Sequence, residues 1–432
     1  MMIHGAGAMS CVLYAQLSGI EALNGVAPVS LFLAIMAALF GLYAIAGRAD
    51  GSWQAVFAWA LLFRLLLIPA GLPAATPWSE KVRMLSEDLR GEAVVYERFL
   101  LYDNDLWRYL WDGHAIAEGR NPYLESPAST GRGEGVWAEV YDNISYEHIP
   151  TLYPPLAELI FRLSHWLAPA SVLMLKLLIV LFDLGAGGLV ALTLRALGRH
   201  PAESLLYLWN PLTVKVFAGS AHIDSVVVFA LALLGYCVVR EFYLAAGVAF
   251  GLAVLAKLSP LVLIGLLARR LPWQSLALGL GVILAGYLPY VSGGVAIFEG
   301  ARTFGSFWEF NAGVLHLIRW VAPGWNARMV CAGLLGVTLF WIWRRKGEFF
   351  GSAADSLGWV VVLSPAVMPW YTTWAMPFAV LGRRRLWLFF SGVVLASFGV
   401  MVDERERWWI LTGEFGLFLL AAWVLRGRRG AA

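Results

Sequence analysis

Long apolar runs separated by short basic loops restrict the fold of this chain more than any other feature. Of its 432 residues 60% are hydrophobic and only 14% are charged, and the mean hydropathy is +0.69. Soluble domains do not usually have such a composition. A helix of about 20 apolar residues is long enough to span a bilayer. The sequence therefore predicts an all-α, polytopic membrane protein.

We expect about 11–14 transmembrane helices in a single membrane-embedded domain that covers residues 1–432. Residues 1–26 lack the basic start and clear cleavage site of a signal peptide, so they are interpreted as a weak extra helix or a tail. The expected spans lie near residues 29–46, 53–72, 171–195, 202–218, 222–239, 243–256, 258–268, 273–291, 327–343, 356–367, 371–382, 386–402 and 408–425.

A polar segment, residues 73–154, interrupts the apolar runs and is expected to be a functional loop because of its length. Residues 155–168 follow with one apolar and one polar stripe, which predicts a helix lying at the membrane surface. Placing arginine-rich loops such as 383–385 in the cytoplasm puts the long loop outside. We therefore expect a multi-pass protein of the cytoplasmic (inner) membrane with an extracytoplasmic active site. If the two short runs around Lys257 form one helix, the later topology inverts.

Charge and cysteine content exclude several classes of protein. The formal net charge is only +3, so the chain lacks the basic surface that nucleic-acid binding needs. Its three cysteines are far apart in sequence and suggest neither a disulfide framework nor a zinc site. It contains no nucleotide-binding or serine-hydrolase motif.

A charged and aromatic block, residues 102–123, stands out inside the long loop. The run from Asp105 to Glu118 predicts a short helix capped by Asn104. Asp105, Arg108, Tyr109 and Asp112 then share one face. A catalytic role competes here with a structural one, because Asp112 can simply pair with Arg108 and Asp103 can help to cap the helix. Asp103 and Asp105 also form a DxD pattern, which is a weak signal for a divalent metal.

Ionisable residues inside or beside the apolar runs also need an explanation, because each costs roughly 2.5–3.5 kcal/mol at mid-membrane. One interpretation is an external cavity in which a carboxylate acts as base and cations hold an anionic lipid headgroup. The other is snorkelling and hydrogen bonding between helices. We favour a functional role for Lys257 and a structural role for Asp183 and Lys215. The residues concerned are Asp183, Lys215, His222, Asp224 and Lys257.

Several motifs in order resemble the polytopic glycosyltransferases of the C-type (GT-C) fold, specifically the bacterial polyprenyl-phosphate-mannose-dependent mannosyltransferase-like group. The matching pieces are NDLWRYLWDG with GRNPY, IPTLYPPLAELIF, AGSAHIDS, AKLSPLVL, FWEFNAG and LSPAVMPWYTTWAMPF. One departure is Met368, where relatives commonly carry histidine before Pro-Trp-Tyr; it weakens mannose as the sugar.

The resemblance implies an inverting transfer of a hexose from a polyprenyl-phosphate sugar to a lipid or glycan hydroxyl outside the membrane, with mannose as the sugar that the family suggests and Asp105 as general base. It implies no cofactor; a divalent metal is possible but not expected. A lipid-linked-sugar flippase or secondary transporter is the alternative. The other residues assigned are Asp103, Arg108, Tyr109 and Asp112 as supporting groups; Lys257, Arg302 and His222 on the donor phosphate; and Asp224, Trp308, Asn311, Trp370 and Tyr371 on the sugar or lipid.

Overall fold

The computed structural model describes residues 1–20, 26–92, 94–402 and 407–427, and across these ranges the chain forms helices and no strand. The predicted all-α, polytopic membrane class is confirmed. Within residues 1–26, a helix α1 (Met2–Leu17) is present, whereas residues 21–25 lie outside the description.

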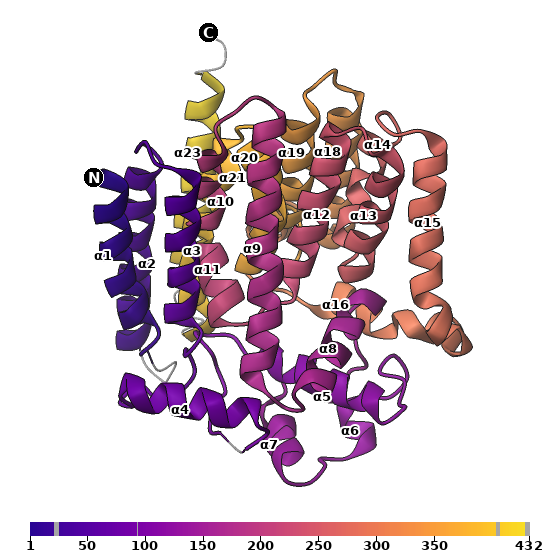
Figure 1. Ribbon diagram of the computed structural model, residues 1–432. Coiled ribbons are helices and arrows are strands. Elements are labelled where there is room, and N and C mark those ends of the chain that lie inside the picture. Colours follow the sequence, from indigo (N-terminus) through magenta and orange to yellow (C-terminus); the bar gives the residue numbers. More distant parts are fainter. Residues whose placement is uncertain (21–25, 93, 403–406, 428–432) are drawn as a thin grey trace.

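Five helical stretches in the described part are long and apolar enough to cross a membrane. Figure 1 shows them spread across the molecule, from indigo at the left to orange at the right. They are α2 (Val26–Ala46), α9 (Val172–Ala196), α15 (Trp273–Tyr287) with its continuation η4 (Leu288–Phe298) and α16 (Glu299–Phe307), α18 (Ala327–Arg344) and α23 (Arg407–Gly427).

Shorter apolar helices fill the space between these five. They are α3 (Trp53–Leu67), α12 (Asp224–Val239), α13 (Tyr243–Ala256), α19 (Phe349–Val362), and α21 (Arg385–Val393) continued by η6 (Val394–Ser397) and α22 (Phe398–Val402).

The expected count of 11–14 spans treated each apolar run as one helix. In the structure, three of these runs form several short helices instead of one. Each contains prolines, which lack the N–H that a continuous helix requires. The pieces are η1 (Pro201–Ser204), α10 (Leu205–Leu208), α11 (Pro211–Val214) and η2 (Lys215–Gly219); η3 (Ser259–Leu263) and α14 (Ile264–Leu267); and η5 (Pro369–Ala375) and α20 (Met376–Leu381).

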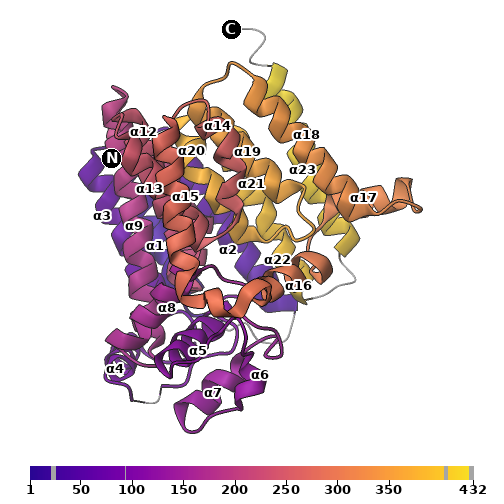
Figure 2. The same ribbon diagram turned by 90° about the vertical axis from the view of Figure 1, so that its right-hand side faces the viewer.

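The long polar segment folds into short helices that gather at one end of the bundle, below the spans in Figure 1. These are α4 (Trp78–Leu89), α5 (Asp105–Ala117), α6 (Pro127–Thr130), α7 (Val136–Asn143) and α8 (Pro155–Leu167). The helices expected at residues 105–118 and 155–168 are thus present as α5 and α8. A further amphipathic helix, α17 (Gly313–Val321), projects at one side of the molecule (Figure 2).

Helices α5 and α8 pack against each other at very short range. A Cβ atom on Gly113 would lie 2.3 Å from the backbone oxygen of Phe161, so only glycine fits at this crossing. One turn earlier on α5, the Tyr109 ring stacks on the Phe161 ring with centroids 4.5 Å apart. The close contact fixes the start of α5 relative to the rest of the loop.

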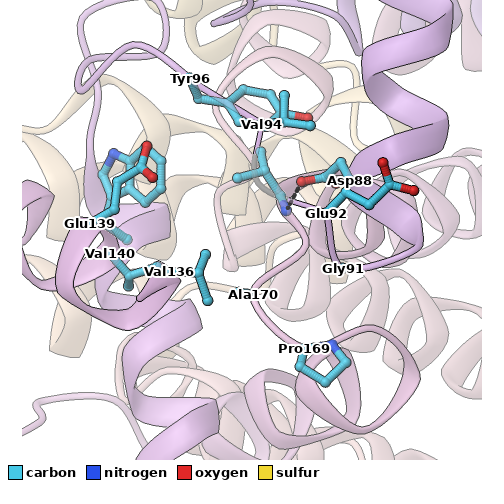
Figure 3. A pocket seen from close by; sticks show the side chains of 12 residues that line it. Asp88, Gly91, Glu92, Val94, Tyr96, Val136, Glu139, Val140, Pro169 and Ala170 are labelled. Atoms are coloured by element: carbon cyan, nitrogen blue, oxygen red, sulfur yellow. Dashed lines mark hydrogen bonds between the residues drawn. The ribbon is translucent and has the colours of Figure 1, made fainter. Parts of the chain in front are cut away.

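The loop is also fastened to the membrane helices. Asp88 of α4 accepts hydrogen bonds from the Ser171 hydroxyl at 2.5 Å and the Leu173 N–H at 2.8 Å, which satisfies free donors at the start of α9. Figure 3 shows this carboxylate beside a pocket of only about 20 Å³. Such a space suits a water molecule and not a sugar.

Candidate active site

Two carboxylates and an imidazole form the centre of the site. Asp103 and Asp105 precede and begin α5, whereas His222 lies between η2 and α12, more than a hundred residues later. The His222 Nε2 atom is hydrogen-bonded to Asp103, and its Nδ1 atom lies 4.0 Å from an oxygen of Asp105. The membrane helices therefore place the imidazole next to the long polar loop.

The backbone around Asp103 explains how two acidic residues come to lie side by side. Leu101 and Tyr102 both adopt positive φ, at 51° and 67°, and this turn leads directly into α5. Asp103 then accepts from the Asp105 N–H at 3.1 Å. The sequence prediction was wrong in one detail, because Asn104 occupies the cap position but its side chain donates to Ser145 at 2.7 Å instead.

His222 is held on every side. It is fully buried, and its ring stacks on Trp370 with centroids 4.1 Å apart. The Tyr109 hydroxyl lies 3.4 Å from Nδ1. Because these contacts fix both the plane and the rotation of the ring, Nδ1 faces Asp105 without freedom to turn away.

A second group of charges lies next to the first. Lys257 Nζ is 3.3 Å from an oxygen of Asp224, and the Trp374 indole N–H donates to the same carboxylate at 2.5 Å. Asp224 also lies 3.8 Å from His222 Nδ1, which joins the two groups.

Lys257 sits where the chain leaves α13 in an extended conformation before η3 begins. This break confirms that the two short runs on either side are separate elements. The ammonium group lies over the rings of Tyr371, Trp374 and Tyr153, at 4.6, 5.5 and 5.9 Å from their centroids. Its side chain remains 14% exposed, so aromatic faces hold the cation while leaving it accessible.

Asp105 has the properties of a proton acceptor. Burial and the neighbouring Asp103 carboxylate raise its pKa to about 6, against the opposing influence of His222 and Lys257. Burial alone would raise the pKa of Asp103 as well, but His222 and Lys215 hold it below its usual value. The Asp105 side chain is 37% exposed, whereas that of Asp103 is 2% exposed. A substrate can therefore reach Asp105 but not Asp103.

A cavity of about 210 Å³ opens beside this cluster. Its lining is mainly apolar and includes Tyr153, Lys257, Phe304, Tyr371 and Trp374. The Tyr153 hydroxyl donates to Asp105 at 3.4 Å, so one side chain touches both the cavity and the carboxylate. A ligand with an apolar tail and an anionic head would meet suitable groups here.

Two predicted supporting residues point elsewhere. The Arg108 guanidinium forms hydrogen bonds with both oxygens of Asp112, at 2.8 and 2.9 Å, and donates to the Ile149 carbonyl. Burial raises the pKa of Asp112 despite this pairing. The structural alternative considered for this pair, a bridge within α5, is the arrangement observed.

Three other predicted residues lie outside the cluster. Arg302, on α16, is 78% exposed and has Glu299 as its ion partner at 3.8 Å. Trp308 packs edge-to-face against Tyr146, with ring centroids 4.1 Å apart, and Asn311 donates to Glu414 at 2.8 Å. The cluster itself gathers Asp103, Asp105, Tyr109, His222, Asp224, Lys257, Trp370 and Tyr371.

Sequence reasoning missed Tyr153 and Trp374. Both stand in motifs that carried the family resemblance, TLYPP and PWYTTW, but aromatic residues near an interface do not reveal which of them face a site. The structure singles them out because each donates a hydrogen bond to a carboxylate of the cluster.

Asp103, Asp105 and His222 could also hold a metal ion, since one ligand atom from each lies within 4.8 Å of the others. Oxygen and imidazole ligands suit several divalent metals. In the observed arrangement, however, His222 and Asp103 already satisfy each other.

Comparison with known proteins gives one family. A sequence model described as "Alpha-(1->6)-mannopyranosyltransferase, N-terminal domain" matches residues 6–271, which is more than half of the chain. No curated protein matches the sequence. The matched range includes the cluster residues up to Lys257 and stops before Trp370, Tyr371 and Trp374.

Proposed function

The chain belongs to the alpha-(1->6)-mannopyranosyltransferase family, and we propose that it transfers mannose with inversion from a polyprenyl-phosphate donor, using Asp105 as general base. Membership of this family makes it a glycosyltransferase that acts in a membrane. The lipid donor, the stereochemical course, the base and the external location of the reaction are our proposals.

One observation carries the proposal: the accessible Asp105 carboxylate, whose pKa is raised, accepts a hydrogen bond from Tyr153, and Tyr153 lines an apolar cavity together with the aromatic-caged Lys257. A general base works best when its pKa is near the operating pH, and about 6 meets this condition. Apart from one long contact with Asp224, at 3.3 Å, the Lys257 ammonium group is held by ring faces, which leaves donors for an incoming phosphate. A soluble nucleotide-sugar donor would not need the apolar cavity.

The reaction would proceed as one displacement. Asp105 accepts the proton of the acceptor hydroxyl while that oxygen attacks the anomeric carbon of mannose. The bond from this carbon to the phosphate oxygen breaks, and polyprenyl phosphate leaves with the electron pair. Lys257 would neutralise the charge that develops on the phosphate. A β-linked donor would thus give an α-linked product, in agreement with the family description.

The other cluster residues would position these two. Asp103 would fix the His222 ring, and the His222 ring would keep a donor or positive charge close to Asp105. Asp224 and Trp374 would hold Lys257 from the far side. Trp370 and Tyr371 would offer ring faces to the sugar or the prenyl chain.

We propose no resident metal for this reaction. In metal-dependent sugar transfer the ion neutralises a diphosphate leaving group, whereas a phosphate monoester carries less charge, and a single lysine is suited to it. Arginine-rich loops at the other end of the molecule favour an inner-membrane protein with the site outside.

The test uses the purified full chain in lipid nanodiscs, polyprenyl-phosphate mannose as donor, GDP-mannose as the competing donor type, and a lipid and glycan extract as acceptor. Asp105→Asn is expected to slow transfer by about 10²–10⁴-fold, the usual effect of losing a general base. Asp142→Asn removes an exposed carboxylate from the same loop and is the matched control, with unchanged transfer expected. Transfer that survives Asp105→Asn would reject the base, and transfer from GDP-mannose alone would reject the lipid donor.

A further inference from the structure

A second hollow lies at the end of the molecule opposite α4–α8, and the proposed transfer does not use it. Its volume is about 470 Å³. Three separate connections line it: those between α2 and α3, between α9 and η1, and between α20 and α21. The start of α1 lies at the same end (Figure 1).

The hollow is rich in positive charge. Basic residues on this membrane face are expected from the positive-inside rule, but that rule does not require three distant loops to converge on one cavity. Four arginines stand against two carboxylates. These residues are Arg48, Arg199, Arg383, Arg385, Asp50 and Glu203.

One of the four arginines builds the wall. Arg199 donates to the carbonyl of Leu381 at 2.5 Å and to that of Val380 at 3.2 Å, and it also pairs with Glu203. These carbonyls are the last of α20 and would otherwise lack partners. Because the Arg199 guanidinium already makes these contacts, the other three arginines remain as candidates for binding an anion.

Arg383 adopts a backbone conformation that favours glycine. Its φ is +51°, and it follows Gly382 at the end of α20, where the Arg384 N–H closes the turn onto the Ala379 carbonyl at 2.8 Å. The side chain is 71% exposed, and its ion contact with Glu203 is long, at 3.9 Å. An arginine held at a strained position with so weak an internal contact points to an external partner.

We propose that this hollow binds the phosphate group of an anionic membrane lipid through Arg48, Arg383 and Arg385. Guanidinium groups match phosphate oxygens in pairs, and basic pockets at the ends of membrane helices are suited to anionic headgroups. His200 adds a donor to the lining, since its Nδ1 accepts from the Ala202 N–H at 3.2 Å and leaves Nε2 to carry the hydrogen.

Binding is tested on the detergent-purified full chain with short-chain phosphatidylglycerol, phosphatidylcholine and inorganic phosphate as probes. Native mass spectrometry measures occupancy, and thermal unfolding measures stability. Arg385→Gln is expected to weaken phosphatidylglycerol binding about fivefold, the effect of one arginine near a lipid headgroup. Arg383→Gly is expected to weaken binding similarly and to raise the melting temperature without lipid, because glycine relieves the positive φ.

Arg270→Gln is the matched control, because it removes one exposed arginine at the same end but outside the hollow. Equal loss in this variant, or unchanged binding in Arg383→Gly and Arg385→Gln, would overturn the proposal. If the protein binds inorganic phosphate but does not bind phosphatidylglycerol, the assignment to a lipid is overturned. Since the hollow is distant from Asp105, failure here would leave the transfer proposal intact.

Discussion

The pH dependence of sugar transfer gives the sharpest test of Asp105, whose pKa is raised to about 6. A base of this pKa is about 91% ionised at pH 7 and about 9% ionised at pH 5, so kcat/KM should fall about tenfold between them. At the ordinary value of 3.8 the same carboxyl would be more than about 90% ionised at both values, and the rate would hardly change. Activity is therefore expected to be lost as pH falls through 6.

The fall in kcat/KM at low pH, called the acid limb below, should shift along the pH axis when either of two neighbours of Asp105 is replaced. The two replacements should shift it in opposite directions. Asp103 raises the pKa of Asp105, so Asp103→Asn is expected to shift the limb to lower pH. Lys257 lowers that pKa, so Lys257→Met is expected to shift the limb to higher pH. Both variants will also be slower, but the position of the limb does not depend on the maximal rate.

The assay measures initial rates at donor concentrations below KM, from pH 4.5 to pH 8, with size-exclusion chromatography to confirm the folded state at each pH. The proposed donor is a phosphodiester and does not titrate in this range. A profile that stays flat between pH 5 and pH 7, or a limb that neither variant moves, would refute the assignment of Asp105 as the titrating base. Asp142→Asn should reproduce the native profile.

Five further outcomes are expected. Lys257→Met should lower kcat/KM by about 10²–10³-fold in the same assay through loss of charge stabilisation, whereas Arg302→Gln, at an exposed position, should change it less than about twofold. EDTA should leave transfer unchanged; loss of activity restored by Mg²⁺ or Mn²⁺ would favour a metal instead. Gly113→Ala should destabilise the protein by about 1–3 kcal/mol in thermal unfolding, because its methyl group meets the α8 backbone; a native melting temperature would contradict that packing. Arg64→Met should cost about 3–5 kcal/mol, since it leaves Asp183 buried without its ion partner at 2.5 Å; an unchanged melting temperature would show the pair to be dispensable.

The sequence was sufficient for the class of fold and for the local elements around the site. Apolar runs predict membrane helices because the bilayer selects for length and hydrophobicity, which are properties of a segment alone. The helix that starts at Asp105 also follows from nearby residues, whereas the break at Lys257 was settled only by the structure. The family assignment confirms the resemblance that the ordered motifs indicated.

The sequence was less able to separate structural charges from charges that face the site. Arg108 and Asp112 share a helix face with Asp105, yet they pair with each other, because a partner four residues away is always within reach. Asn311 lies in the family-like motif FWEFNAG and Arg302 lies just before it, but both have their partners outside the cluster. Spacing along the chain shows which charged groups are able to pair, but it does not show which of the possible partners each group pairs with in the folded protein.

Only the tertiary structure decided how the cluster is assembled. His222, Lys257 and Trp374 come from three distant segments, and their approach to α5 depends on how helices cross, which no local pattern records. The pKa of Asp105 has the same origin, since it results from burial and from Asp103, His222 and Lys257 together. Hydrophobicity and helix formation act over neighbouring residues and can be read from the sequence, whereas burial and electrostatics act through space and exist only once the chain is folded.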